Sequence, residues 1–292
     1  TTGEPGTTIV DTTGEPDTST GPGTTATTTT GDPSTTSTTT TTTGDTTTGD
    51  PVAISKGPSK GGSVAANEAG DTLAVANRAT GDITLFALGG AAPVIRATVA
   101  VGAEPVSVSW HPDNHTLFVV RRVGGFVTRI DDADSDAPTV GASVEVGAEP
   151  GMAALTPLGQ TLYVSNWVDG TVSVVDTEAM TVSDTIAVGG APYAVCMTND
   201  GDELEDDETV FVTDFYARAV PGALEATDGA RQGRVFRIAT ADNSISESTL
   251  APLVDAGIPA TPGPGVYPNQ LYTCTVNLDH VYIGAVGASP KS

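Results

Sequence analysis

The sequence predicts an all-β fold, a β-propeller of four-stranded antiparallel blades that follows a disordered Thr-rich segment. Two observations carry this prediction. A Val-Gly-x-x-Pro motif returns at 101–105, 146–150 and 188–192, at intervals of 45 and 42 residues. Between these motifs, short runs of alternating apolar residues are separated by Gly, Asp, Asn and Pro. Four short strands in every 40 to 45 residues are typical of a propeller blade.

The N-terminal part, residues 1–52, has the composition of a stalk rather than of a folded domain. Thr accounts for 25 of the first 50 residues, and most of the others are Gly, Pro, Asp, Ser and Glu. Such a segment cannot bury enough apolar surface to offset the entropy of ordering it. We therefore expect an extended spacer, of a composition that is often O-glycosylated.

The blades are expected to fill residues 53–292. The repeat places them at 53–100, 101–145, 146–187 and 188–262, with a partial fifth at 263–292. The most regular copy predicts strands at 151–155, 161–166, 171–176 and 182–188, because apolar side chains alternate there and turn residues separate the runs. Four blades and part of a fifth predict an incomplete ring, either a piece of a longer chain or one that closes by association.

One strand ending carries a resemblance to a known family. Residues 163–166 read Tyr-Val-Ser-Asn within "YVSNWVDGTVSVVDT", and "VGGAPYAV" follows. This pattern resembles the YVTN-type β-propeller repeat, well over residues 60–215 and poorly over 216–292. The resemblance implies a seven-bladed type of ring and an exported or surface protein. It implies little about activity.

The charge of the chain excludes some partners. The net charge is −24, and the stalk accounts for only seven of these negative charges, since it has seven acidic residues and no Lys or Arg. The blades are therefore strongly acidic themselves, and they lack the cationic footprint that nucleic acids or anionic membranes require. The sequence also shows no transmembrane run and no signal peptide. We expect an exported protein of the cell surface, outer membrane or periplasm, whose signal peptide has been removed and which an upstream lipid anchor could hold.

A binding face is expected where two kinds of connection meet. In a propeller, the connection between blades and the loop between the second and third strands open on the same face. Aromatic residues and Arg dominate interface energetics, so we expect a recognition face there. The alternative is that these loops are ordinary solvated loops. The candidate residues are Arg121, Arg122, Trp167, Asp169, Asp214, Tyr216 and Arg218. An insertion at 214–235, with three Arg residues, departs most from the repeat and could form a partner-binding lip.

Acidic runs on the opposite face are weak calcium candidates. Alternating carboxylates occur at 131–136 and 199–208, but the Gly and the distal Glu of an EF-hand loop are missing. Solvated acidic turns are the alternative. The candidate ligands are Asp132, Asp134, Asp136, Asp200 and Asp202. No other cofactor is expected, because the three His residues (His111, His115 and His280) do not form a metal set.

The two cysteines occupy matching positions. "PYAVCMTND" and "QLYTCTVNLD" align, which places Cys196 and Cys274 on the inner strands of the fourth and fifth blades. A disulfide requires Cα atoms within about 7 Å. Because equivalent positions on neighbouring blades usually lie farther apart, two buried thiols are the favoured expectation and a disulfide the alternative.

These features favour a non-catalytic ligand- or protein-binding or scaffold propeller at the cell envelope. No catalytic nucleophile arrangement and no phosphate-binding Gly loop is present. One alternative is the propeller part of a larger surface redox (cytochrome-associated) or lactonase-like enzyme. Another is a calcium-dependent adhesion protein. The sequence does not identify the ligand, whether this is a protein or a small molecule.

Overall fold

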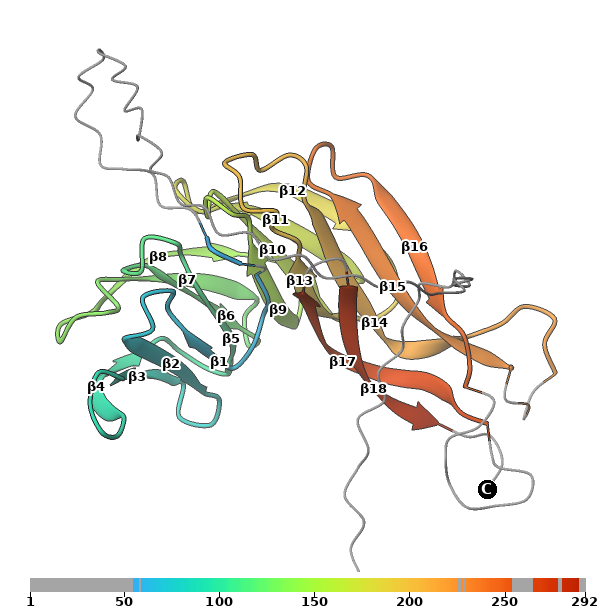
Figure 1. The fold of residues 1–292 in the computed structure, drawn as a ribbon, viewed down its shortest axis with the longest axis horizontal. Helices are drawn as coiled ribbons and strands as arrows, with labels where there is room; N and C mark the ends of the chain where they lie inside the picture. Colours follow the sequence, from blue (N-terminus) through green and yellow to red (C-terminus); the bar gives the residue numbers. More distant parts are fainter. Residues whose placement is uncertain are drawn as a thin grey trace, which may run out of the picture. The chain divides into compact units, whose positions relative to one another are not determined.

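The computed structural model describes residues 55–57, 59–224, 227, 229–253, 265–277 and 280–288. All the regular secondary structure in these residues is β-strand, which confirms the predicted all-β class (Figure 1). The predicted stalk, residues 1–52, lies outside the described residues.

The strands form four four-stranded antiparallel sheets and one two-stranded sheet, each in sequence order. The first sheet contains β1 (Val64–Ala66), β2 (Thr72–Asn77), β3 (Asp82–Ala87) and β4 (Val94–Ala100). The second contains β5 (Pro105–Trp110), β6 (Leu117–Arg121), β7 (Phe126–Asp131) and β8 (Thr139–Glu145). The third contains β9 (Pro150–Leu155), β10 (Thr161–Asn166), β11 (Thr171–Asp176) and β12 (Thr181–Ala187). The fourth contains β13 (Pro192–Met197), β14 (Thr209–Ala219), β15 (Arg231–Ala239) and β16 (Ile245–Leu250), and the last contains β17 (Tyr267–Asn277) and β18 (His280–Ala288). Four blades and a partial fifth were predicted, and the strands of the third blade lie within one residue of their predicted bounds.

In the second, third and fourth blades the first strand is mostly buried and the fourth is mostly exposed. In the third blade, β9 and β10 are almost wholly buried, whereas β12 is mostly exposed. The apolar side chains pack between neighbouring sheets. One cluster joins Tyr163, Val172 and Val174 of the third sheet to Val195 and Phe236 of the fourth. The core therefore lies between the faces of adjacent blades, because a single sheet cannot bury its own face.

The Tyr and Asn of the Tyr-Val-Ser-Asn strand ending have structural roles. The Tyr163 hydroxyl donates a hydrogen bond to Asn243 Oδ1 of the fourth blade (3.0 Å). Burial raises the pKa of Tyr163 to about 12. The Asn166 side chain is fully buried, and its Nδ2 donates to Thr171 Oγ1 (3.0 Å) and Ser173 Oγ (2.9 Å) of the next strand. These two residues therefore join neighbouring blades and neighbouring strands, respectively.

The insertion of the fourth blade is mostly a β-hairpin, whereas the sequence predicted only a departure from the repeat. Its ends extend β14 and β15, which are the long paired strands of this sheet in Figure 1. After an irregularity beyond Asp214, pairing resumes with Arg218 opposite Gln232 and Ala219 opposite Arg231. The hydrogen bond from Ala217 N to Asn269 Oδ1 (2.9 Å) fixes the hairpin to β17.

The two cysteines form a disulfide between β13 and β17. Their Cα atoms are 5.9 Å apart, and their sequence separation is 78. The favoured expectation of two buried thiols is therefore not what the structure shows. The distance is short enough because β13 and β17 are adjacent inner strands that pack directly against each other.

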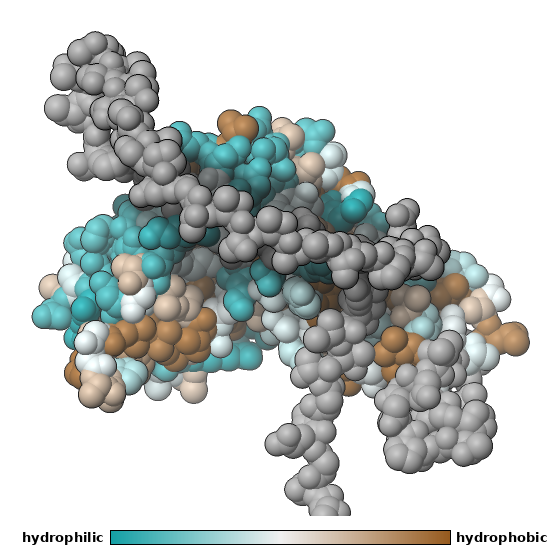
Figure 2. Space-filling view, in the orientation of Figure 1, coloured by the Kyte–Doolittle hydropathy of each residue, from teal (hydrophilic) through white to brown (hydrophobic). Residues whose placement is uncertain are grey.

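An apolar area lies on the surface of the first sheet. Figure 2 shows brown, hydrophobic side chains gathered over the region of β1–β4. Val64, Val94 and Ile95 of this sheet are more than half exposed. Blade faces normally pack against a neighbour, and the contacts of the first sheet with β5 do not cover these side chains. Such a surface fits the predicted incomplete ring, because a missing neighbour leaves the face of a terminal blade exposed.

Candidate binding surface

The two kinds of connection meet on one face, as the sequence predicts. Arg78, after β2, forms an ion pair with Glu104 of the next connection (Nη2–Oε2, 3.0 Å). Arg122, after β6, lies 3.4 Å from Glu149 in the same way (Nε–Oε2). Trp167 N, after β10, donates to Glu149 O (3.2 Å). The loops that follow the second strands are thus held by the connections between blades.

An aromatic cluster forms where the third and fourth blades meet. Trp167 contributes the central ring, which lies 5.4 Å from Tyr193, 4.8 Å from Phe215 and 5.6 Å from Tyr216 between ring centroids. Interplanar angles of 58° to 84° put these rings in tilted and edge-to-face contacts, which aromatic pairs favour. Tyr216 is 49% exposed, and Val168 beside Trp167 is 60% exposed.

Arginine residues flank the aromatic cluster. The Arg122 guanidinium lies 6.0 Å from the centre of the Trp167 ring, within cation–π range. Arg218 follows Tyr216 by two residues on β14. We call Trp167, Tyr193, Phe215 and Tyr216, together with Arg122 and Arg218, the aromatic–arginine surface.

The buried carboxylate of Asp214 holds the Arg218 side chain of this surface in place. Asp214 is fully buried, and its Oδ1 accepts a hydrogen bond from Ala191 N (2.9 Å). Its Oδ2 accepts from Arg218 Nε (2.7 Å), Arg234 Nη2 (2.8 Å) and Arg234 Nε (3.1 Å). The hydrogen bond to Asp214 raises the pKa of Arg218, whose side chain is 42% exposed. Two cations therefore share this carboxylate, and Arg234 also forms an ion pair with Glu247 (Nη1–Oε2, 2.9 Å).

A hollow of about 800 Å³ adjoins the surface on the side of the first and second blades. Arg78 and Arg122 line it together with acidic residues, Glu104, Glu145, Glu149 and Asp169. Gly124, Gly125 and Gly147 also line it. This hollow provides hydrogen-bonding groups beside the aromatic rings, the mixture of polar and aromatic groups found at interfaces.

Two of the predicted face residues have other roles. The Arg121 guanidinium stacks 4.9 Å from the centre of the Phe126 ring, and burial lowers its pKa. Arg121 therefore does not join the aromatic cluster. Asp169 is exposed, but its Oδ2 accepts a hydrogen bond from Ala148 N (2.7 Å), so it holds the connection between the second and third blades.

Two rings of the aromatic–arginine surface, Tyr193 and Phe215, were not predicted from the sequence, and Arg234 was predicted only as one of the three Arg residues of the insertion. Tyr193 directly follows Pro192 of the repeated motif, and Phe215 directly precedes Tyr216. Arg234 lies near the C-terminal end of the insertion and pairs directly with Asp214 across β14 and β15. Register across the hairpin was the signal that could have revealed Arg234.

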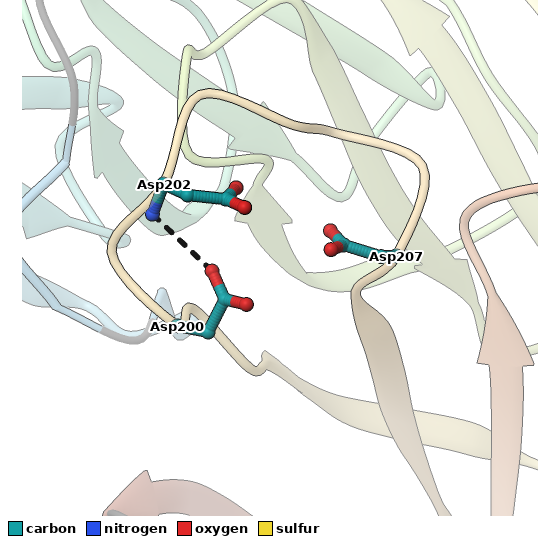
Figure 3. A group of neighbouring side chains, drawn as sticks. All are labelled: Asp200, Asp202 and Asp207. Atoms are coloured by element: carbon teal, nitrogen blue, oxygen red, sulfur yellow. Dashed lines mark hydrogen bonds between the residues drawn. The ribbon is translucent and has the colours of Figure 1, made fainter.

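The calcium candidates behave differently in the two acidic runs. In the first, Asp134 pairs with His115 (2.9 Å, Oδ2–Nδ1) and Asp136 with Arg96 (3.7 Å, Oδ1–Nε), while Asp132 is exposed. In the second, the carboxylates of Asp200 and Asp202 point toward that of Asp207, with ligand atoms within 4.8 Å of one another (Figure 3). Asp207 is thus an addition to the predicted set.

The last residue of the second acidic run, Glu208, has a buried carboxyl group. Glu208 is 3% exposed, and it accepts hydrogen bonds from the Thr198 hydroxyl and from Asp200 N. Burial raises the pKa of Glu208, and the nearby Asp200 and Asp207 act in the same direction. This run follows the end of β13, whereas Asp214 pairs with Pro192 at its start. The acidic run and the aromatic–arginine surface therefore lie at opposite ends of β13, on opposite faces of the propeller.

No family model matches this chain, and no curated protein matches it. Among solved structures, it resembles hydrazine synthase of Kuenenia stuttgartiensis, with 16% identity and a TM-score of 0.48 over 76% of this chain and 72% of that one. It resembles the periplasmic gluconolactonase PpgL of Pseudomonas aeruginosa with 14% identity and a TM-score of 0.50, over 78% and 58% of the two chains. For AztD of Citrobacter koseri, the identity is 15% and the TM-score 0.43, over 77% and 51%.

Of these three comparisons, the one with the gluconolactonase reaches a TM-score of 0.50, and at 14% identity it supports the fold alone. The chain spans little more than half the length of the gluconolactonase and of AztD. Together with the four-stranded antiparallel sheets, the similarity to the gluconolactonase supports a propeller as the fold class. No described helix of this chain has the length and apolarity that crossing a membrane requires.

Proposed function

We propose that this chain is a non-catalytic, protein-binding β-propeller module and that the aromatic–arginine surface is its binding site. The observation that carries the proposal is the cluster of four aromatic rings, with Tyr216 half exposed and Arg122 over Trp167. Trp, Tyr and Arg are the residues that most often dominate the binding energy of protein interfaces. The YVTN type of repeat is the family that best fits this module.

The geometry of the rings favours a protein partner over a stacked sugar. A sugar ring needs an open aromatic face, but the Trp167 ring is contacted by three other rings and by the Arg122 guanidinium. What remains accessible is Tyr216, Val168 and the Arg218 side chain. An apolar centre with a charged rim is the usual composition of a protein–protein interface.

We place the protein outside the cytoplasm, at the cell surface or in the periplasm. The Thr-rich stalk motivates this location. The disulfide between Cys196 and Cys274 supports it independently, because disulfides persist mainly in oxidising compartments. An upstream lipid anchor remains part of the same proposal, and the gluconolactonase neighbour is described as periplasmic.

A lactonase-like or redox enzyme is the second candidate. The names of the neighbours, a gluconolactonase and hydrazine synthase, motivate it. The inner strands argue against it, since β5, β9 and β13 contain no His, Asp or Glu. The carboxylate group found among the described residues lies on the acidic run after β13 and not on these strands.

Two matched tyrosine variants test the proposal. Tyr216 and Tyr272 are nearly equally exposed, at 49% and 47%, but Tyr272 lies on β17 outside the cluster. The full chain and the variants Tyr216→Ser and Tyr272→Ser are immobilised and exposed to an envelope extract of the source organism. We expect a protein that is retained by the wild type and by Tyr272→Ser and is lost from Tyr216→Ser. Identical retention by all three would contradict the proposed surface.

A further inference from the structure

A short segment before β1 lies along the inner strands of three blades. Gly61 N donates to Val195 O (3.0 Å), and Met197 N donates to Ser59 O (2.9 Å). Lys60 thereby forms an antiparallel bridge with Cys196 on the free inner edge of β13. In a propeller the first strand of each blade has no partner on its inner side, so residues 59–61 act as an added strand.

The same segment also binds the second and third blades. Ser59 Oγ accepts a hydrogen bond from Leu155 N (2.9 Å) at the end of β9. Gly62 O accepts from Val108 N of β5 (2.8 Å), and Gly62 N donates to Ser107 Oγ (3.2 Å). Five hydrogen bonds made by Ser59, Gly61 and Gly62 therefore connect the segment to β5, β9 and β13. We call the space between these three strands the inner groove.

The inner groove discriminates between side chains. A Cβ atom on Gly61 would lie 2.5 Å from Met152 Cβ and 2.7 Å from Ala153 N, closer than packed atoms can approach. The neighbouring Lys60 is exposed, because successive side chains of an extended strand point to opposite sides. The groove thus accepts glycine at one position and any residue at the position before it. A cavity of about 520 Å³ beside the segment gives room for longer side chains.

We propose that the inner groove is a binding site for an extended peptide with Ser, any residue and then glycine. In this structure the chain's own residues 59–62 fill the site. Main-chain hydrogen bonds supply the affinity and the Gly61 position the selectivity, as in other cases where a peptide adds a strand to an open sheet edge. The site is separate from the aromatic–arginine surface, and the proposal does not depend on the function of that surface.

Because the segment is tethered to β1, it competes with any added peptide at a high effective concentration. Weakening the tethered segment should therefore open the groove to a peptide in solution. Gly61→Ala in the full chain does this, since the added methyl group meets the backbone of Ala153. Gly57→Ala is the matched control, because a Cβ at Gly57 has nothing within 4 Å.

The probe is a fluorescent peptide with the sequence of residues 54–64, and its binding is followed by anisotropy. We expect the peptide to bind the Gly61→Ala protein at least about tenfold more tightly than the wild type or Gly57→Ala. A peptide that itself carries Gly61→Ala should not bind. Equal binding to all three proteins, binding of the altered peptide, or no binding to a folded Gly61→Ala protein would overturn the proposal.

A milder variant covers the case in which Gly61→Ala does not fold, as judged by near-UV circular dichroism. Ser59→Ala removes the hydrogen bond from Leu155 N, and the loss of one such bond corresponds to about a fivefold change in affinity. We expect a peptide affinity about fivefold above that of the wild type. We also expect faster hydrogen exchange at the Met197 amide, which the peptide slows again. Unchanged affinity and exchange would overturn the proposal.

Discussion

Replacement of Asp214 by Asn tests how the aromatic–arginine surface is held in place. The equivalent strand ending in the third blade carries Asn166, since Asn166 pairs with Pro150 as Asp214 pairs with Pro192. Asn therefore fits this position of the blade. The change removes the negative charge that Arg218 and Arg234 share and leaves the shape of the side chain nearly unchanged.

The expected loss follows from burial and exposure. Breaking a fully buried ion pair costs about 3–5 kcal/mol. Arg218 and Arg234 are 42% and 20% exposed, so water compensates part of this loss. We expect a decrease of about 2–3 kcal/mol in the free energy of unfolding, or a Tm lower by about 5–10 °C for a domain of this size. Near-UV circular dichroism should change as well, because Phe215 and Tyr216 directly follow Asp214.

Thermal unfolding monitored by circular dichroism measures the effect. Asp169→Asn is the control on the same face, because Asp169 is exposed and an Asn oxygen can still accept from Ala148 N. We expect the control to keep the Tm of the wild type. A Tm for Asp214→Asn within about 1 °C of the wild type would refute the reasoning, because it would mean that the shared carboxylate contributes almost nothing.

Three further predictions concern the disulfide and the acidic run. Reduction of Cys196–Cys274, which are 78 residues apart, should lower the free energy of unfolding by about 4 kcal/mol through loop entropy, and an unchanged denaturation midpoint after reduction would exclude this contribution. Because the pKa of Glu208 is raised on folding, the wild type should lose stability as the pH rises above 4.5 through the folded-state pKa, and Glu208→Gln should flatten this dependence in denaturant titrations at several pH values. Finally, we expect millimolar calcium to raise the Tm of the wild type more than that of Asp202→Asn, since a cation relieves repulsion among Asp200, Asp202 and Asp207, whereas equal shifts would count against a site there.

The blades could be predicted because their signal is local and repeated. Alternation of apolar side chains and the Val-Gly-x-x-Pro motif located the strands of the third blade to within one residue. The meeting of the inter-blade connections with the loops that follow the second strands also followed from the repeat. The repeat alone therefore predicts that Arg122, Trp167 and Tyr216 share a common face.

Other features depend on contacts between distant residues. The disulfide depends on how closely β13 and β17 pack, and no local pattern reports that distance. The segment at 59–62 shows no alternation of apolar and polar side chains. It is held instead by hydrogen bonds to backbone atoms and small side chains of other blades, which no local sequence pattern reports. The hairpin arms of the insertion were hidden because an irregularity after Asp214 interrupts the strand pairing. Tyr193 and Phe215 become neighbours of Trp167 only through the packing of two blades.

The central claim is that the aromatic–arginine surface contacts a partner protein. Site-specific photo-crosslinking in intact cells tests it most directly, with a benzophenone amino acid at Val168 or at Val140. Both residues are exposed, at 60% and 50%, but Val168 adjoins Trp167, whereas Val140 lies on the outer strand β8. We expect one discrete cross-linked product from position 168 that disappears with Tyr216→Ser and is absent at position 140. The same products from both positions, or a product at 168 that survives Tyr216→Ser, would contradict the account.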